Sequence, residues 1–185
     1  MQHCVVAVHA WCSAKRLQLN PSMSEIIWFG TRATLKRLEN TNLNLHVGSE
    51  TVTPFNVVRD LGVLYSKLIM RQHINKIVGV CFYHLRRPKK FPRILGSSVT
   101  CRLVTAFVTS HLDYCNALLA GLPQSTIALL QRVQNAAVRL VSGLRPRDHV
   151  ASSLRGLHWL PIRYRIIFKL CLMMHNAHVG RSRAS

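Results

Sequence analysis

Carboxylate side chains are scarce in this sequence of 185 residues. Asp and Glu number 6 against 25 Lys and Arg, which gives a formal net charge of +19. The acidic residues stand singly, and the dipeptide Asp-Asp does not occur. Metal-dependent phosphoryl transfer needs two or three carboxylates that converge on one site. Folding could bring together Glu25 and Asp60 on neighbouring predicted strands, which leaves at most a weak site, so we assign no catalytic residue and no metal ligand.

A Cys-x-x-Cys pair and a Gly-rich phosphate loop are also absent. The 6 cysteines are dispersed through apolar or helical segments, and the glycines are isolated. We therefore expect reduced, buried thiols in place of a disulfide framework. Cys171, His175 and His178 share one predicted helix but have no partner pair elsewhere, so they are weak candidates for a zinc site.

Long apolar runs are missing as well. Residues 103–131 form the longest lightly charged run, but they contain Asp113 and Pro123 and have amphipathic spacing. We therefore expect no membrane span. The start of the chain has no basic region and no cleavage site, so a signal peptide is not expected. The nucleus and the cytoplasm both stay open as locations, and secretion is not expected.

What the sequence has in excess is positive charge. The 25 cations cannot all pair with 6 anions, so several must form a positive surface. Such a surface indicates a polyanionic partner, nucleic acid in preference to an anionic membrane. Any single cation is more often merely solvated, so the prediction concerns the set. The candidate nucleic-acid-binding residues are Arg59, Arg71, Lys76, Arg86, Arg87, Lys89, Lys90, Arg132 and Arg139.

Four aromatic residues lie close to basic residues in the sequence and could stack on bases or riboses. They are Phe82, Tyr83, Phe91 and Trp159. Packing in the hydrophobic core is the alternative and more common use of such side chains.

The spacing of apolar residues divides the chain into a mixed part and a helical part. In the first part we expect a helix at 3–19, a short strand at 25–29, a hairpin at 43–53 and one strand at 57–64. Gly62 within the last strand indicates a bulge or a close approach of another backbone. The expected fold is α+β and mostly helical, with a small antiparallel β region. The predicted domains are residues 1–66 and 67–180, followed by a disordered tail at 181–185.

The longer helices of the second part each have an apolar face. Ser125 is expected to cap the helix that follows it. The residues expected to face the core are Ile74, Ile77, Val78, Cys81 and Leu85; Val99, Leu103, Ala106, Phe107, Tyr114 and Leu118; Leu130, Val133, Ala137, Leu140 and Val141; and Ile162, Ile166, Leu170, Met173 and Ala177.

Several stretches, taken in order, resemble one protein family. They are residues 11–21 (WCSAKRLQLNP) with 25–30 (EIIWFG), 59–63 (RDLGV), 73–87 with 129–140 (LLQRVQNAAVRL), and 157–166 (LHWLPIRYRI). Together they resemble the reverse transcriptases of LINE-type, non-LTR retrotransposons, in particular jockey-like elements. The resemblance implies that residues 1–66 are the C-terminal edge of the palm, with a primer-grip strand, and that 67–180 are the helical thumb and post-thumb region.

The resemblance also implies which parts of the family's enzyme this chain lacks. The family's catalytic carboxylates lie on earlier palm strands, including an aromatic-Ala-Asp-Asp turn, and its cofactor is Mg²⁺. We therefore expect no cofactor in this fragment. Met23 stands where the family usually has a lysine that can protonate the leaving pyrophosphate. Tyr65 and Ser66 stand where an aspartate is usual. Both departures fit a decayed copy.

We therefore expect a truncated, catalytically incomplete fragment that is not an enzyme by itself. It would retain salt-sensitive, sequence-nonspecific binding of RNA or an RNA–DNA duplex. The missing palm and fingers segment of the parent polyprotein is a further candidate partner.

Two alternatives stay open. A helical protein-interaction module of the host would bind an acidic protein and bind RNA weakly. A translated pseudogene remnant would give little soluble protein, because a palm fragment exposes a sheet edge and apolar surface.

Overall fold

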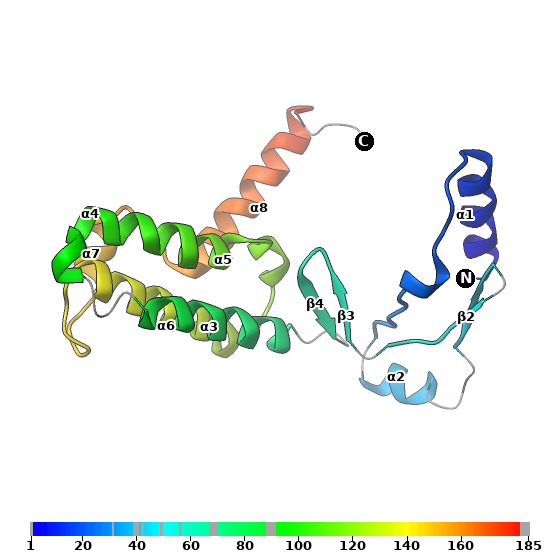
Figure 1. Cartoon of the computed structure of the whole chain (residues 1–185), viewed down its shortest axis with the longest axis horizontal. Helices are drawn as coiled ribbons and strands as arrows, with labels where there is room; N and C mark the ends of the chain where they lie inside the picture. Colours follow the sequence, from blue (N-terminus) through cyan, green and yellow to red (C-terminus); the bar gives the residue numbers. More distant parts are fainter. Residues whose placement is uncertain are drawn as a thin grey trace. The chain divides into compact units, whose positions relative to one another are not determined.

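A computed structural model describes residues 2–30, 32–38, 41, 43–48, 50–55, 57–66, 70–87 and 92–181. The chain divides into two compact units, Met1–Gln72 and His73–Ser185, and each is described by itself. Antiparallel hairpins lie in the first unit and helices make up most of the second (Figure 1), so the predicted α+β, mostly helical fold class is confirmed. The predicted boundary after residue 66 falls inside the first unit. Residues 182–185 of the predicted tail lie outside the described residues.

The first unit begins with α1 (Gln2–Ala14), which is shorter than the helix predicted at 3–19. It ends because Arg16 adopts a left-handed conformation with φ of 59°, and the Leu17 amide then donates to the Cys12 carbonyl at 2.8 Å. This is the hydrogen-bond pattern of a Schellman cap, built here without glycine. A 3₁₀ turn, η1 (Pro21–Met23), and a short helix, α2 (Arg32–Leu38), follow.

The predicted hairpin at 43–53 is confirmed as β1 (Leu45–Val47) paired with β2 (Glu50–Val52). Val47 and Val52 are buried. The side-chain amide of Gln2 donates to the His46 carbonyl at 2.9 Å and accepts from the His46 amide at 3.1 Å. This double hydrogen bond ties the start of α1 to the hairpin.

The strand predicted at 25–29 is wrong. Within the described residues this segment makes one isolated parallel bridge, between Ile26 and Pro54, and the Phe55 amide donates to the Ile26 carbonyl at 2.8 Å. Pro54 has no N–H to extend a ladder, so the pairing stops there.

The single strand predicted at 57–64 is also wrong, because the stretch is a hairpin. β3 (Val57–Asp60) pairs with β4 (Val63–Ser66), and Asp60 lies opposite Val63. Leu61 and Gly62 form the two-residue turn with φ of 44° and 84°. Positive φ at both positions is typical of the type I′ turn, which matches the twist of paired strands. Gly62 therefore makes the turn and not a bulge.

The second unit consists of helices joined by short connections (Figure 1). They are α3 (Arg71–Arg86, which begins in the first unit), α4 (Pro92–Val104), a π-helical turn η3 (Thr105–Thr109), α5 (Ser110–Asp113), a 3₁₀ turn η4 (Asn116–Leu119), α6 (Gln124–Val141), α7 (Ala151–Gly156) and α8 (Ile162–His178).

The faces predicted for α3 and α6 are largely confirmed. Ile74, Ile77, Cys81 and Leu85 of α3 are buried, and Val78 is half-buried. In α6 the predicted set is buried except for Leu140, which is half-buried. The predicted Ser125 cap is wrong, since α6 begins after Pro123 without a side-chain cap.

The face predicted for residues 99–118 is wrong by about one position. The buried residues of this stretch are Thr100, Val104, Val108, Leu112 and Asn116, and Leu119 directly after it is also buried. The predicted Val99, Phe107, Tyr114 and Leu118 are 43–52 % exposed. Because apolar residues stand next to one another in this stretch, the sequence made two helix faces equally plausible as the buried one. A π-helical turn at Thr105–Thr109 interrupts the α-helical period within this stretch, so that period alone could not choose between the two faces.

The inward face predicted for α8 is correct only at its start. Ile162 and Ile166 are buried, whereas Met173 is 54 % exposed and Ala177 is exposed. Figure 1 shows the C-terminal half of α8 extending away from the other helices of its unit. Its apolar side chains are therefore exposed in this structure.

Side-chain amides join α6 to the start of α8. Gln134 is 2 % exposed and donates from Nε2 to the Leu160 carbonyl at 2.8 Å. Gln131 accepts at Oε1 from the Ile162 amide at 3.0 Å and donates from Nε2 to Gln134 Oε1 at 2.9 Å. Ile162 is the first residue of α8, and its N–H has no partner within the helix. We call Gln131, Gln134, Leu160 and Ile162 the amide clamp.

The turn between β3 and β4 gives a test of the hairpin. Leu61 is 80 % exposed, so its side chain contributes little packing, but a left-handed conformation is costly for leucine. Asparagine tolerates this conformation and is preferred before glycine in type I′ turns. We expect Leu61→Asn to raise the free energy of unfolding by about 1 kcal/mol in urea titrations. Leu61→Ala is the control and should give no comparable gain, and an equal gain would contradict the turn assignment.

Candidate nucleic-acid interface

Four of the candidate cations lie on α3 or directly after it. Arg71, Lys76, Arg86 and Arg87 are exposed, and the opposite side of the helix carries the buried residues. α3 contains no Asp or Glu. None of the four cations forms a salt bridge with a carboxylate of the described residues. We call the exposed side of α3, with these four cations, the basic face.

Gly79 lies in the middle of the basic face. It comes three residues after Lys76 and four before Tyr83, so it is a neighbour of both on the helix surface. A Cβ added at Gly79 would meet no atom within 4 Å. Packing therefore does not require glycine here, although glycine inside a helix costs about 1 kcal/mol relative to alanine. No side chain therefore projects from the basic face at Gly79, so another backbone can come close there. We call this position the low point of the basic face.

The aromatic candidates are only partly available for stacking. Tyr83 is 57 % exposed, and the Arg87 guanidinium lies over its ring at 5.4 Å from the centroid. Phe82 and Trp159 are half-buried. Phe91 lies outside the described residues.

The other candidate cations do not lie on α3. Arg59 is exposed on β3 in the first unit, and Lys89 and Lys90 lie outside the described residues. On α6, Arg132 is exposed. Arg139 is half-buried: its Nη2 donates to the Asp148 carbonyl at 3.3 Å, and its Nε is buried without a hydrogen-bond partner. Arg139 is thus the least accessible of the candidates that the structure describes.

The prediction that the cysteines are buried is wrong for half of them. Cys4, Cys115 and Cys171 are exposed, Cys101 is intermediate, and only Cys12 and Cys81 are buried. All six cysteines are unpaired in the structure. Burial raises the pKa of the Cys81 thiol to about 12, so this thiol stays protonated.

Side chains that could hold a metal ion do not gather within the described ranges. No three His, Cys, Asp or Glu side chains of these ranges come close enough to bind one. Cys171, His175 and His178 of α8 therefore do not form such a group.

Two features of the second unit have no counterpart among the residues predicted from the sequence. Gly79 gave a signal, since glycine inside a helical pattern calls for an explanation. The second feature is a pocket that includes Asp113 and Arg165, which are 52 positions apart and paired at 2.5 Å. No local pattern could have indicated this pair.

Comparison with known proteins adds no family assignment: no protein-family model, curated protein or solved structure matches the chain. The resemblance to LINE-type reverse transcriptases therefore stays a prediction. Among the helices of the described residues, none has the length and apolar character required to cross a membrane.

A histidine on the buried side of α3 should make the stability of the fold depend on pH. Burial, and secondarily the charge of Lys76, lowers the pKa of His73 from its usual 6.5. The unfolded chain therefore takes up a proton at this histidine more readily than the folded chain does, and stability falls as the pH drops below about 6.5. We expect the urea midpoint to fall between pH 7.5 and pH 5.5, and His73→Leu to reduce that fall. His149→Leu, at an exposed position, is the control. An equal fall in wild type and His73→Leu would contradict the assignment.

Proposed function

We propose that this chain is the palm-edge and thumb portion of a LINE-type reverse transcriptase and that it binds RNA or an RNA–DNA duplex without sequence preference. The observation that carries the binding proposal is the basic face of α3, where Arg71, Lys76, Arg86 and Arg87 are exposed along one helix without a carboxylate. The resemblance of the ordered sequence stretches supports the identity of the portion.

Electrostatics favours a nucleic acid as the partner. Clustered exposed cations repel one another, and a polyanion relieves this repulsion and releases counterions. The formal charge of +19 extends the same preference to the whole chain. Contacts to phosphates carry no sequence information, so binding through them is nonspecific.

The low point at Gly79 favours a duplex or a strand that lies along α3. Without a side chain at Gly79, the helix backbone can approach a sugar–phosphate backbone while Lys76 and Arg86 reach phosphates on either side. A close approach shortens the hydrogen bonds to these phosphates, and shorter charge-assisted hydrogen bonds are stronger.

The proposal is one of binding and includes no catalytic step. The family's Mg²⁺ is held by paired carboxylates, and hard divalent cations need several oxygen ligands. In the first unit the described carboxylates, Glu25, Glu50 and Asp60, belong to no group of three side chains that could hold a metal ion. The donor set therefore does not fit the family's metal site.

The basic face can be tested by removing its charge. A variant with Arg71→Gln, Lys76→Gln, Arg86→Gln and Arg87→Gln keeps side chains that favour helix. We expect the slope of log affinity against log salt to become shallower by about 3 units, because each phosphate that is no longer neutralised accounts for about 0.7 to 0.9 units. Fluorescence anisotropy with a labelled RNA–DNA duplex and a labelled single-stranded RNA, at several salt concentrations, measures this.

The matched control removes four exposed arginines of the second unit that lie outside α3. Arg102, Arg145, Arg147 and Arg155 are exposed and lie outside α3. Their replacement by glutamine lowers the net charge equally but should change the slope by less than the basic-face variant does. Equal slopes in wild type and the basic-face variant would contradict the proposal.

Gly79 gives a second test, with one substitution that reports on stability and another that reports on affinity. Gly79→Ala should raise the free energy of unfolding by about 1 kcal/mol, since the added methyl group meets nothing. Gly79→Leu should weaken nucleic-acid binding about tenfold, because a bulky side chain holds the backbones apart. A Cβ added at Gly156, at the end of α7, would also meet no atom within 4 Å. Gly156→Leu is therefore the control. Unchanged affinity in Gly79→Leu would remove Gly79 from the interface.

One observation favours a second candidate, a helical protein-interaction module. The C-terminal half of α8 exposes Leu172, Met173 and Met174 at 41 %, 54 % and 73 %. Exposed apolar helices commonly pack against a partner. Under this candidate the basic-face variant would keep its affinity for RNA, whereas substitutions in α8 would abolish binding of an acidic protein partner.

A further inference from the structure

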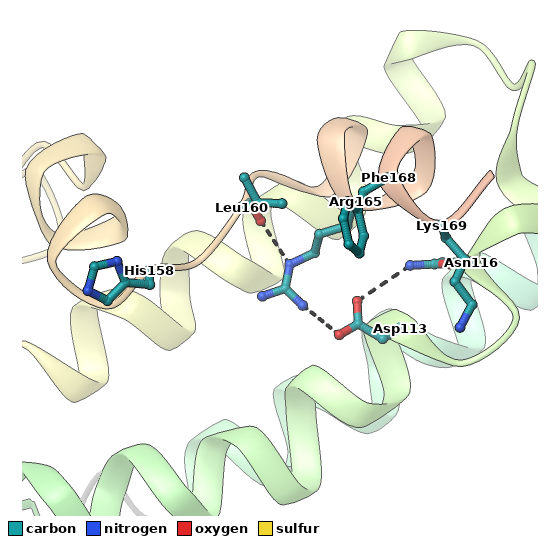
Figure 2. A pocket seen from close by; sticks show the side chains of 7 residues that line it. All are labelled: Asp113, Asn116, His158, Leu160, Arg165, Phe168 and Lys169. Carbon is teal, nitrogen blue, oxygen red and sulfur yellow. Dashed lines mark hydrogen bonds and ion pairs between the residues drawn. The ribbon is translucent and has the colours of Figure 1, made fainter. Parts of the chain in front are cut away.

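The second unit contains a pocket of about 300 Å³ between the end of α5, η4 and the start of α8. The residues that line it are Asp113, Asn116, His158, Leu160, Arg165, Phe168 and Lys169 (Figure 2). None of them belongs to α3. We propose that this pocket binds one unpaired nucleotide, with the base against Phe168 and the phosphate at Lys169.

One wall of the pocket is held in place by Arg165. Its side chain is 15 % exposed, and Figure 2 shows its guanidinium between Asp113 and the Leu160 carbonyl. Nη1 contacts Asp113 Oδ2 at 2.5 Å, and Nε donates to the Leu160 oxygen at 2.8 Å. Asp113 Oδ1 accepts from Asn116 Nδ2 at 3.4 Å. The polar groups are thus positioned before any ligand arrives, which reduces the entropy cost of binding.

The charge of the lining favours an anion. Arg165 compensates Asp113, the one carboxylate in the lining. Lys169 is exposed on the next turn of α8 and adds a positive charge that no lining residue balances. A phosphate group is an anion that a lysine ammonium binds well. The phosphate of the ligand therefore belongs at the Lys169 side of the pocket.

The apolar part of the lining favours a flat group. Phe168 is 60 % exposed and Leu160 is 47 % exposed. An exposed phenyl ring at the edge of a pocket offers a face for stacking, and nucleobases stack on such rings without regard to sequence. A site for an anion next to a site for a flat group indicates a nucleotide. An inorganic anion would fill only the first of the two.

The buried amide of Asn116 supplies an independent indication. Asn116 is 4 % exposed, and its Nδ2 donates to Asp113. Its Oδ1 is buried and has no hydrogen-bond partner. A buried acceptor without a donor is costly, and a ligand N–H relieves that cost only if the Asn116 side chain turns so that this oxygen faces the pocket. Nucleobase edges carry such N–H donors.

The size of the pocket selects the form of the nucleotide. A volume of about 300 Å³ lies at the lower end of the range for ligand pockets and has no room for a base pair. The same chemistry is available from a free mononucleotide and from an unpaired end of a strand. The two sources can be separated by experiment.

The test uses the full chain with two probes. Adenosine 5′-monophosphate is titrated by equilibrium dialysis, and labelled duplexes with and without a single-nucleotide overhang are titrated by anisotropy. Two matched pairs are compared: Phe168→Ala with Ile167→Ala, and Lys169→Gln with Arg163→Gln. All four side chains are exposed, and Ile167 and Arg163 do not line the pocket.

We expect Phe168→Ala and Lys169→Gln each to weaken binding of the mononucleotide at least about fivefold, and their controls to leave it unchanged. A preference for the overhang duplex that both variants lose would assign the site to strand ends, and mononucleotide binding without that preference would assign it to free nucleotides. The absence of both saturable mononucleotide binding and overhang preference would overturn the proposal, as would equal losses in variants and controls. Because the basic-face variant leaves the pocket intact, loss of duplex binding in that variant alone bears on the proposed function and not on the pocket.

Discussion

The second unit depends on the amide clamp between α6 and the start of α8. Gln134 is buried, yet its amide is satisfied by the Leu160 carbonyl and by Gln131. Gln131 in turn takes up the first N–H of α8. Leaving one partner of such a buried network unpaired costs more than the network contributes when complete. The clamp therefore fixes where α8 begins and in which direction it leaves α6.

The direction of α8 determines what its first turns can do. With Ile162 and Ile166 buried against the core, Arg165 reaches Asp113, and Phe168 and Lys169 come to the mouth of the pocket. Beyond this point the helix extends away from the other described helices of its unit (Figure 1). Along α8 the buried isoleucines and the arginine that pairs with Asp113 thus come first, and the exposed apolar side chains follow.

The sequence predicted the parts of the fold in which polarity and period agree. In α3 and α6 the apolar stripe is flanked by cations, so only one face can be buried. In residues 99–118 neighbouring apolar side chains made two faces equivalent, and a π-helical turn interrupts the α-helical period there. The hairpin at Leu61 was missed because leucine is rarely found in a left-handed turn. For the candidate site, composition indicated the basic face, whereas the pocket depends on an ion pair between Asp113 and Arg165 that only the fold creates.

α3 also couples its two sides to each other. Lys76 lies on the basic face, but its charge contributes to the lowered pKa of His73 on the buried side. An anion that neutralises Lys76 removes that contribution and makes His73 easier to protonate. By thermodynamic reciprocity, protonation of His73 then strengthens the binding of the anion by the same factor. If the basic face binds phosphate as proposed, proton uptake at His73 and phosphate binding at Lys76 are linked equilibria of one helix, with no conformational change required to connect them.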